Sequence, residues 1–80
     1  MALEKNTALI LAFGHRVRSL RLERGLSMRE LCESLNIDLH QLSRVEKGQV
    51  ATSIVTAFAL ASVFELSLSE LFDFEVEAIE

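Results

Sequence analysis

The stretch SMRELCESLNIDLHQLSRVEKG, residues 27–48, decides how this chain folds. Ser27 is followed three residues later by Glu30, a pair that caps the start of a helix because each side chain accepts a hydrogen bond from the other residue's backbone N–H. Asp38 and Gln41 repeat this spacing further along the stretch. Apolar residues at helical spacing follow each pair. We therefore predict two short helices joined by a tight turn.

The turn between these helices is Asn36-Ile37-Asp38. Asn36 tolerates the left-handed backbone conformation that such a turn needs. A connection this short sets the second helix of the pair steeply across the first, with its outer side free of the rest of a small bundle. Such a helix fits the major groove of B-DNA, which is about 12 Å wide. The pair therefore indicates duplex DNA as a ligand.

Helical signals precede this pair. An apolar stripe at helical spacing predicts an amphipathic first helix, and it consists of Leu9, Phe13, Val17 and Leu20. Asn6 or Thr7 can cap the start of this helix, and Gly25 lies where a left-handed residue ends one. Gly14 lies inside the helix, where glycine costs up to about 1 kcal/mol relative to alanine.

Two more helices follow the pair. The first begins at Thr52 or Ser53 and is apolar on nearly all sides, which is typical of a core helix. Its apolar residues are Ile54, Val55, Ala57, Phe58, Leu60, Ala61 and Phe64. Another capping box, Ser67-Leu-Ser-Glu70, opens a short last helix that runs to about residue 72.

The pattern changes at the C-terminus. Phe72-Asp-Phe-Glu-Val-Glu77 alternates apolar and acidic residues, which is typical of a strand. Because a lone strand is not stable in water, the acidic tail (73–80) is either solvated or disordered, or it contacts a second chain. We predict one domain, residues 1–80, with a core over about 8–74 and the two-helix unit at 27–47.

Charge is distributed unevenly along the chain. The net charge is −4, which is unfavourable for binding a polyanion. Residues 15–47 hold seven Arg or Lys and five Asp or Glu, whereas residues 51–80 hold six acidic residues and no Arg or Lys. A nucleic acid would therefore approach the middle of the chain. The side chains of Arg16, Arg18 and Arg24 form a solvated helix face or contact phosphate.

Seven short motifs lie along most of the chain and together carry a family resemblance. They are Arg16-Val-Arg-x-Leu20-Arg21, Gly25-Leu-Ser27, Glu30-Leu31, Leu35-Asn-Ile37, Leu42-Ser-Arg-Val45-Glu46-Lys47-Gly48, Leu60-Ala61 and Leu66-x-Leu68-x-Glu70-Leu71-Phe72. Together they resemble the lambda-repressor/Cro-like (XRE) helix-turn-helix family over about residues 14–74. The resemblance implies an all-α bundle of five helices whose second and third helices read DNA. A short C-terminal strand or tail would then serve dimerisation.

By position, the resemblance assigns the DNA contacts. His40, Gln41 and Arg44 would face base edges, where an arginine suits guanine and a glutamine suits adenine. A second set would contact phosphates and fix the register on the duplex, and it consists of Ser27, Met28, Ser43, Lys47 and Gln49.

Four further positions carry expectations. The resemblance implies a structural ion pair of Arg21 with Glu46, which would hold the first helix to the end of the third. Met28 stands where glutamine is frequent in the family. Asp38 places a negative charge at the edge of the DNA face, where it caps its helix but repels phosphate. Leu39 either touches a thymine methyl or lies in the core.

We expect a homodimer, because one unit of this size reads too few base pairs for high specificity. Two units on a near-palindrome, about one helical turn apart, would remove this limit. Apolar residues near the C-terminus exceed what one small core needs, and we expect them to form the dimer surface: Phe64, Leu66, Leu68, Phe72, Phe74, Val76 and Ile79.

Nothing in the sequence favours catalysis, a cofactor or a membrane. It has no Ser/His/Asp set, no glycine-rich phosphate loop and no carboxylate pair in an evident cleft. Two histidines, His15 and His40, are too few for a metal site. Cys32 is the only cysteine, and we expect it to pack in the core rather than sense redox. We expect no signal peptide and no membrane span.

We therefore predict a cytoplasmic, sequence-specific DNA-binding homodimer that regulates transcription. It would act as an autonomous repressor, a restriction-modification controller, or an antitoxin that also autoregulates. The alternative is a protein-interaction module or antitoxin-like partner with the same fold and weak affinity for DNA. The net charge of −4, Met28 and Asp38 support this alternative.

Overall fold

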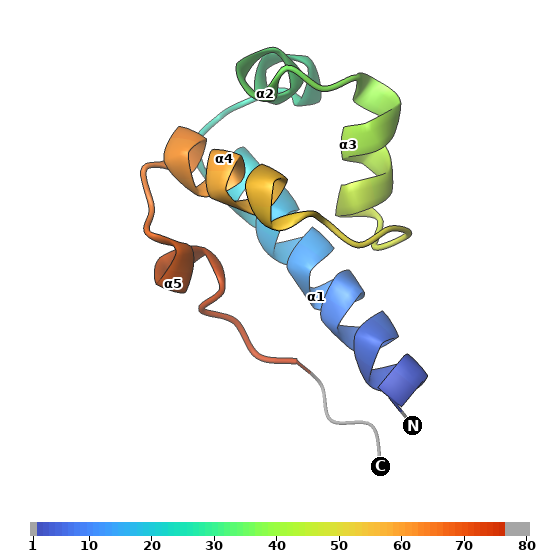
Figure 1. The fold of residues 1–80 in the computed structure, drawn as a ribbon. Helices are drawn as coiled ribbons and strands as arrows, with labels where there is room; N and C mark the ends of the chain where they lie inside the picture. The colour runs from blue at the N-terminus through green and yellow to red at the C-terminus, as the bar shows by residue number, and fades with distance from the viewer. Residues whose placement is uncertain (1, 77–80) are drawn as a thin grey trace.

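Five helices joined by short turns make up the fold of residues 2–76 (Figure 1). The computed structural model describes the backbone of residues 2–76 and the side chains of residues 6–76. The helices are α1 (Ala2–Glu23), α2 (Met28–Leu35), α3 (Leu39–Glu46), α4 (Ile54–Phe64) and α5 (Leu68–Leu71). The prediction of an all-α, five-helix bundle is confirmed.

The long helix α1 forms the back of the bundle, and α3 and α4 both contact it (Figure 1). α2 lies at one end of the bundle and contacts α3 and α4, while α5 packs beside α4. α1 begins at Ala2, so the prediction that Asn6 or Thr7 caps it is wrong. Both residues continue the helix, because asparagine and threonine cost only a fraction of a kcal/mol, up to about 0.7, inside one.

Two capping boxes fix the starts of α2 and α5. The Ser27 hydroxyl accepts from the Glu30 amide at 3.0 Å, and Glu30 Oε1 accepts from the Ser27 amide at 2.8 Å. Ser67 and Glu70 make the same two bonds at 3.1 and 2.8 Å. The bond from the Ser67 amide, and secondarily the Ser67 hydroxyl nearby, favour the ionised Glu70 carboxylate and lower its pKa.

Left-handed residues end several of the helices. Gly25, Asn36 and Gly48 have φ values of 66°, 59° and 71°. The sequence predicts the turn at the first two, and it also ends the third helix at Gly48. Glu65 adopts the same conformation after α4, with φ of 60°, although a residue with a Cβ rarely does.

A single apolar core lies between the helices. Its buried side chains are Phe13, Val17, Leu20, Leu31, Cys32, Leu42, Val45, Ala57, Leu60, Ala61, Phe64 and Leu71. Burial raises the pKa of the Cys32 thiol, and the negative charges of Asp38 and Glu46 add to the effect. The thiol therefore stays protonated at neutral pH, which disfavours its reaction as a nucleophile.

The C-terminal segment folds back on α1 without forming a strand. The rings of Phe72 and Phe74 lie 5.5 and 6.4 Å from that of Phe13. These aromatic contacts hold the chain, and residues 72–76 pair with no other strand. The strand that the alternating pattern is typical of therefore does not form over its described part, and residue 77 lies outside the described residues.

α4 is buried on one side only. It buries Ala57, Leu60, Ala61 and Phe64. Its opposite side exposes Ile54, Val55 and Phe58 by 68%, 75% and 61%. The expectation of a core helix is therefore wrong for half of its surface. None of the described helices combines the length and the apolar character that crossing a bilayer requires.

Candidate nucleic-acid interface

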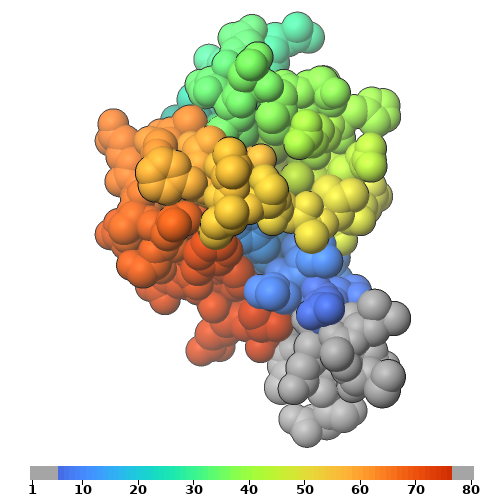
Figure 2. Space-filling view, viewed as in Figure 1, coloured from blue at the N-terminus to red at the C-terminus, as the bar shows by residue number. Residues whose placement is uncertain are grey.

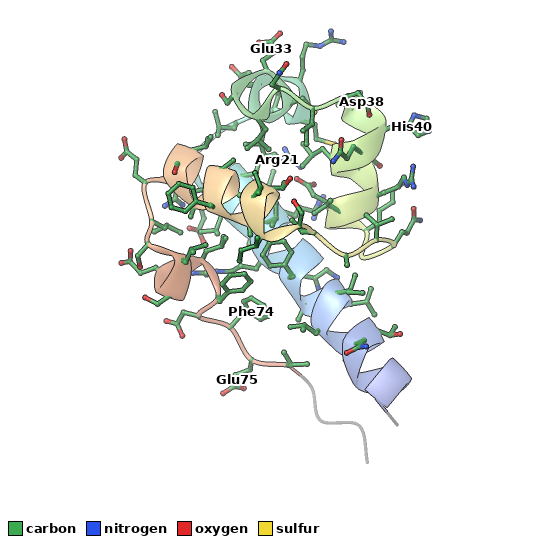
Figure 3. All side chains as sticks on the ribbon, in the orientation of Figure 1. Arg21, Glu33, Asp38, His40, Phe74 and Glu75 are labelled. Carbon is green, nitrogen blue, oxygen red and sulfur yellow. The ribbon has the colours of Figure 1, made fainter. Side chains whose placement is uncertain are left out.

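α3 stands at the edge of the bundle with its apolar side turned inward. Leu42 and Val45 are buried against the core. The Asp38 side chain caps the helix, because its Oδ1 accepts from the Gln41 amide at 2.7 Å. Figure 3 shows Asp38 and His40 at the start of α3, away from the centre of the bundle. The outer side of α3 is therefore open to a large ligand.

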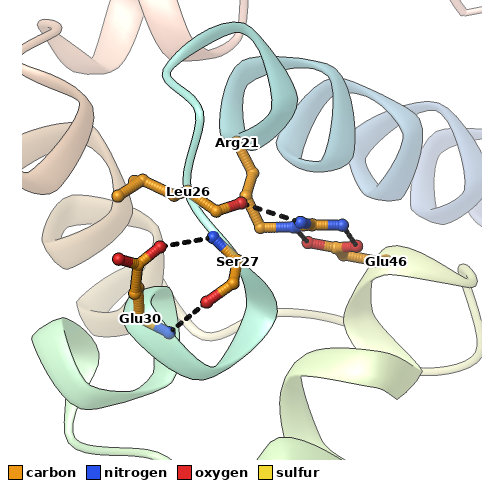
Figure 4. A network of polar contacts seen from close by, with 5 residues as sticks. All are labelled: Arg21, Leu26, Ser27, Glu30 and Glu46. Carbon is orange, nitrogen blue, oxygen red and sulfur yellow. Dashed lines mark hydrogen bonds and ion pairs between the residues drawn. The ribbon is translucent and has the colours of Figure 1, made fainter.

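A buried ion pair holds the C-terminal end of α3 to α1 (Figure 4). Arg21 Nε and Nη2 donate to the two carboxylate oxygens of Glu46 at 2.8 and 3.1 Å. Nη1 of the same guanidinium donates to the carbonyl oxygen of Leu26 at 2.9 Å. Arg21 and Glu46 are only 7% and 6% exposed. The structure thus brings together the two residues that the family resemblance pairs.

Gly14 lets α1 approach the end of α3 closely. A Cβ atom at this position would lie 2.5 Å from the Val45 carbonyl oxygen and 2.8 Å from that of Glu46. Both distances are shorter than real contacts allow, and both neighbours are backbone atoms. A glycine inside α1, costly for the isolated helix, therefore serves the packing of α1 on α3.

The outer side of α3 brings the predicted base-contact residues together. His40, Gln41 and Arg44 are exposed, and together with Asp38 and Val50 they line one surface hollow of about 410 Å³. Hydrogen-bond donors and acceptors here stand beside the methyl groups of Val50, a combination that suits base edges. Val50 has no sequence signal of its own, because one valine in the loop after α3 forms part of no periodic pattern.

The predicted phosphate-contact residues differ in how far their side chains are exposed and free. Lys47 and Gln49 expose their side chains, Ser43 is half-buried, and the Ser27 hydroxyl and amide are occupied in the capping box of α2. Met28 is half-buried and packs against the core, so it offers apolar surface rather than a donor. Leu39 is 49% exposed, which places it at the surface rather than in the core.

Two arginines, Arg16 of α1 and Arg24 directly after it, bind the ends of other helices. Arg16 donates to the carbonyl oxygens of Leu71 and Glu70 at 3.2 and 2.7 Å. Arg24 donates twice to the Phe64 carbonyl oxygen at 3.1 and 2.9 Å, and its guanidinium lies 5.3 Å from the ring centroid of Phe64. Neither arginine is simply solvated, and both donate to carbonyl oxygens at helix C-termini, where a positive charge is favourable. Arg18 is exposed.

The residues predicted to form a dimer surface differ in exposure. Phe64 is 1% exposed and belongs to the core, so placing it in a dimer surface is wrong. Leu66, Leu68 and Phe74 are half-buried against the core. Phe72 and Val76 are exposed. Ile79 lies outside the described residues.

A family model described as Helix-turn-helix (HTH_3) matches residues 17–71 of this chain. The chain belongs to the XRE-type helix-turn-helix family. Within the family it is 33% identical over 58 residues to the HTH-type transcriptional regulator DdrOP3 of Deinococcus deserti, which covers 72% of this chain and 45% of that protein. It is 37% identical over 62 residues to the HTH-type transcriptional regulator PuuR of Escherichia coli, which covers 78% of this chain and 34% of that protein. The chain thus spans less than half the length of these relatives.

Solved helix-turn-helix structures share the fold. The restriction-modification controller protein C.AhdI from Aeromonas hydrophila superposes with a TM-score of 0.72 at 35% identity, covering 79% of this chain and 94% of that one. The clp gene regulator ClgR from Corynebacterium glutamicum superposes with a TM-score of 0.75 at 27% identity, covering 79% of this chain and 67% of that one. The bundle therefore matches known helix-turn-helix folds across most of its length.

Proposed function

We propose that this helix-turn-helix chain binds double-stranded DNA sequence-specifically as a homodimer and regulates transcription. The observation that carries the proposal is the hollow on the outer side of α3, which His40, Gln41 and Arg44 line together. The buried ion pair and the close approach at Gly14 fix the inner side of the same helix. A rigid helix with a free polar side is what entry into the major groove requires.

In this proposal the side chains of α3 have separate tasks. Arg44 donates to guanine O6 and N7, and Gln41 pairs with adenine. Lys47, exposed where α3 ends, contacts a phosphate and contributes affinity without sequence preference. The relatives named as transcriptional regulators support the same role for this chain.

The decisive experiment substitutes Arg44 with alanine. Duplexes selected by the protein from a random pool serve as specific DNA, and an unselected duplex of equal length serves as random DNA. We expect Arg44→Ala to weaken specific binding by about 5- to 150-fold, the equivalent of one lost base contact of about 1–3 kcal/mol. Random binding should change by much less.

Lys47→Ala is the matched control. It should weaken specific and random binding about equally and reduce the slope of log affinity against log salt by about one. If Arg44→Ala also lowers both affinities equally, Arg44 contacts the backbone and does not read bases. If the wild-type protein binds neither duplex at low salt, the proposal is wrong.

One observation favours a second candidate function, a protein-interaction module with weak affinity for DNA. Arg16 and Arg24 are engaged with backbone carbonyls, which leaves fewer cations for a polyanion on a chain of net charge −4. A salt slope near zero, or no binding at low salt, is the outcome that this candidate predicts.

A further inference from the structure

One face of the molecule exposes large apolar side chains from three separate segments. α4 contributes Ile54, Val55 and Phe58, and Leu9 of α1 and Phe72 are 46% and 42% exposed. We call these five residues the apolar face. In Figure 2 the first half of α4, in yellow and orange, lies on the viewer's side, next to parts of α1 in blue and the C-terminal segment in red.

A cavity of about 140 Å³ opens beside α4, between α1, the loop that precedes α4, and Phe72. Leu9, Phe13 and Ala57 are among its lining residues, none of which is charged. Thr52 is the one polar residue of the lining, and its buried hydroxyl oxygen has no hydrogen-bond partner within the described chain. The rest of the lining is apolar, so the cavity suits an apolar group.

The apolar face is large for a chain of this size. At about 150–200 Å² for a whole large apolar side chain, the exposed parts of the five residues amount to roughly 500 Å². Contiguous apolar patches of more than a few hundred Å² mark interaction sites on soluble proteins. A standard interface covers about 800 Å² on each partner, so this face and its rim are sufficient for one.

We infer that a second copy of this chain covers the apolar face, in a dimer with two-fold symmetry. The inference rests on the proposed function, which calls for a dimer. Of the predicted C-terminal residues it keeps Phe72, and it moves the rest of the dimer surface to α4 and α1. In a two-fold interface both copies use the same patch, so a projecting group and its recess must share one face.

Phe58 and the cavity meet this requirement. The Phe58 ring projects from α4 into solvent, and Ala57, the residue before it, lines the cavity. An apolar cavity of about 150 Å³ is known to hold a benzene molecule, so the recess has the right size for a phenyl ring of the second copy. The five residues carry no charge that would repel an identical face.

This arrangement leaves the outer side of α3 free. None of the five residues belongs to α2 or α3, and none lines the hollow of His40, Gln41 and Arg44, although Val50 borders both that hollow and the cavity. A dimer formed through α4 and α1 therefore keeps one α3 available for DNA in each copy.

The test is the oligomeric state of three variants of the full chain, measured by sedimentation over a concentration series. Phe58→Glu removes the projecting ring, and Leu9→Glu places a charge at the recess. Leu22→Glu is the matched control, because Leu22 is also about half exposed but lies at the far end of α1. We expect the wild-type protein and Leu22→Glu to dimerise equally, and each of the other two to raise the dissociation constant at least about 100-fold.

The outcomes separate this inference from the proposed function. If the wild-type protein dimerises and neither Phe58→Glu nor Leu9→Glu weakens the dimer, the surface lies elsewhere and only the inference fails. If the wild-type protein remains monomeric at about 100 µM, the inference fails together with the homodimer of the proposed function, and DNA binding by that monomer decides the rest of the proposed function. Circular dichroism shows which variants fold, and if Phe58→Glu does not, Leu9→Glu decides alone.

Discussion

α3 and α4 are both short helices with one buried side, but their outer sides differ in kind. α3 exposes polar and charged side chains, namely His40, Gln41 and Arg44. α4 exposes apolar ones, namely Ile54, Val55 and Phe58. The inner sides are alike in function, because both pack on α1 and contribute to the same core.

The difference shows what each outer side is suited to bind. A polar side at the surface is well hydrated, so its exposure carries no free-energy penalty before a hydrophilic ligand such as DNA binds. An apolar side of three neighbouring large residues is less favourable exposed than buried, by about 25 cal/mol for each Å² of apolar surface. The outer side of α3 is therefore suited to reversible binding, whereas the outer side of α4 favours a permanent partner.

Breaking the inner side of α3 should have the largest effect on stability. Glu46→Ala leaves the Arg21 guanidinium buried without its carboxylate, and we expect a loss of about 3–5 kcal/mol in the free energy of unfolding. Urea unfolding followed by circular dichroism measures it. The exposed Arg18→Ala is the control and should change stability by less than about 0.5 kcal/mol.

The double replacement of Arg21 by methionine and Glu46 by leucine sharpens this result. Because it removes both charges together, it should cost clearly less than Glu46→Ala alone. A loss below about 1 kcal/mol for Glu46→Ala would contradict the account, since α3 would then be held by its apolar contacts without the ion pair.

Gly14→Ala tests the close approach of α1 to the same helix. An exposed helix would gain up to about 1 kcal/mol from this change, because alanine favours the helix over glycine. Here the new methyl meets the Val45 and Glu46 carbonyl oxygens, so we expect a net loss of about 1–3 kcal/mol, the usual cost of overpacking.

The sign of the change in stability therefore decides whether the close approach is real. Thermal unfolding of Gly14→Ala is compared with that of Ser19→Ala, an exposed position on α1 where the change should be neutral or slightly stabilising. A gain in stability for Gly14→Ala would mean that α1 and α3 lie further apart than described.

Much of the fold follows from local signals in the sequence. The capping boxes at Ser27 and Ser67 predict where α2 and α5 begin, because they depend on residues only three positions apart. Gly25 and Asn36 mark turns for the same local reason. Since His40, Gln41 and Arg44 lie within one short helix, the period of that helix suffices to place them on one side.

Features that depend on distant parts of the chain escaped prediction. Arg16 and Arg24 bind carbonyl groups 40 or more positions away, and no local pattern identifies those partners. Val50 reaches the α3 hollow only because a loop turns back toward it. For α4 the reason differs: an apolar residue has the same sequence signature whether its own core or a second chain covers it.

The smallest expected effect on stability is that of Asp38→Asn, which changes the outer edge of α3 and leaves its fold intact. Asparagine caps a helix about as well as aspartate, so the free energy of unfolding should change by less than about 0.5 kcal/mol. Removing the negative charge should raise the affinity for random duplex DNA up to about fivefold at low salt, and added salt should reduce the gain.

Asp73→Asn, in the segment after α5, is the control. It removes the same charge far along the chain from α3 and should leave the affinity unchanged. Equal gains in affinity for both variants would mean that only the net charge matters. The outer side of α3 would then not be the surface that DNA approaches.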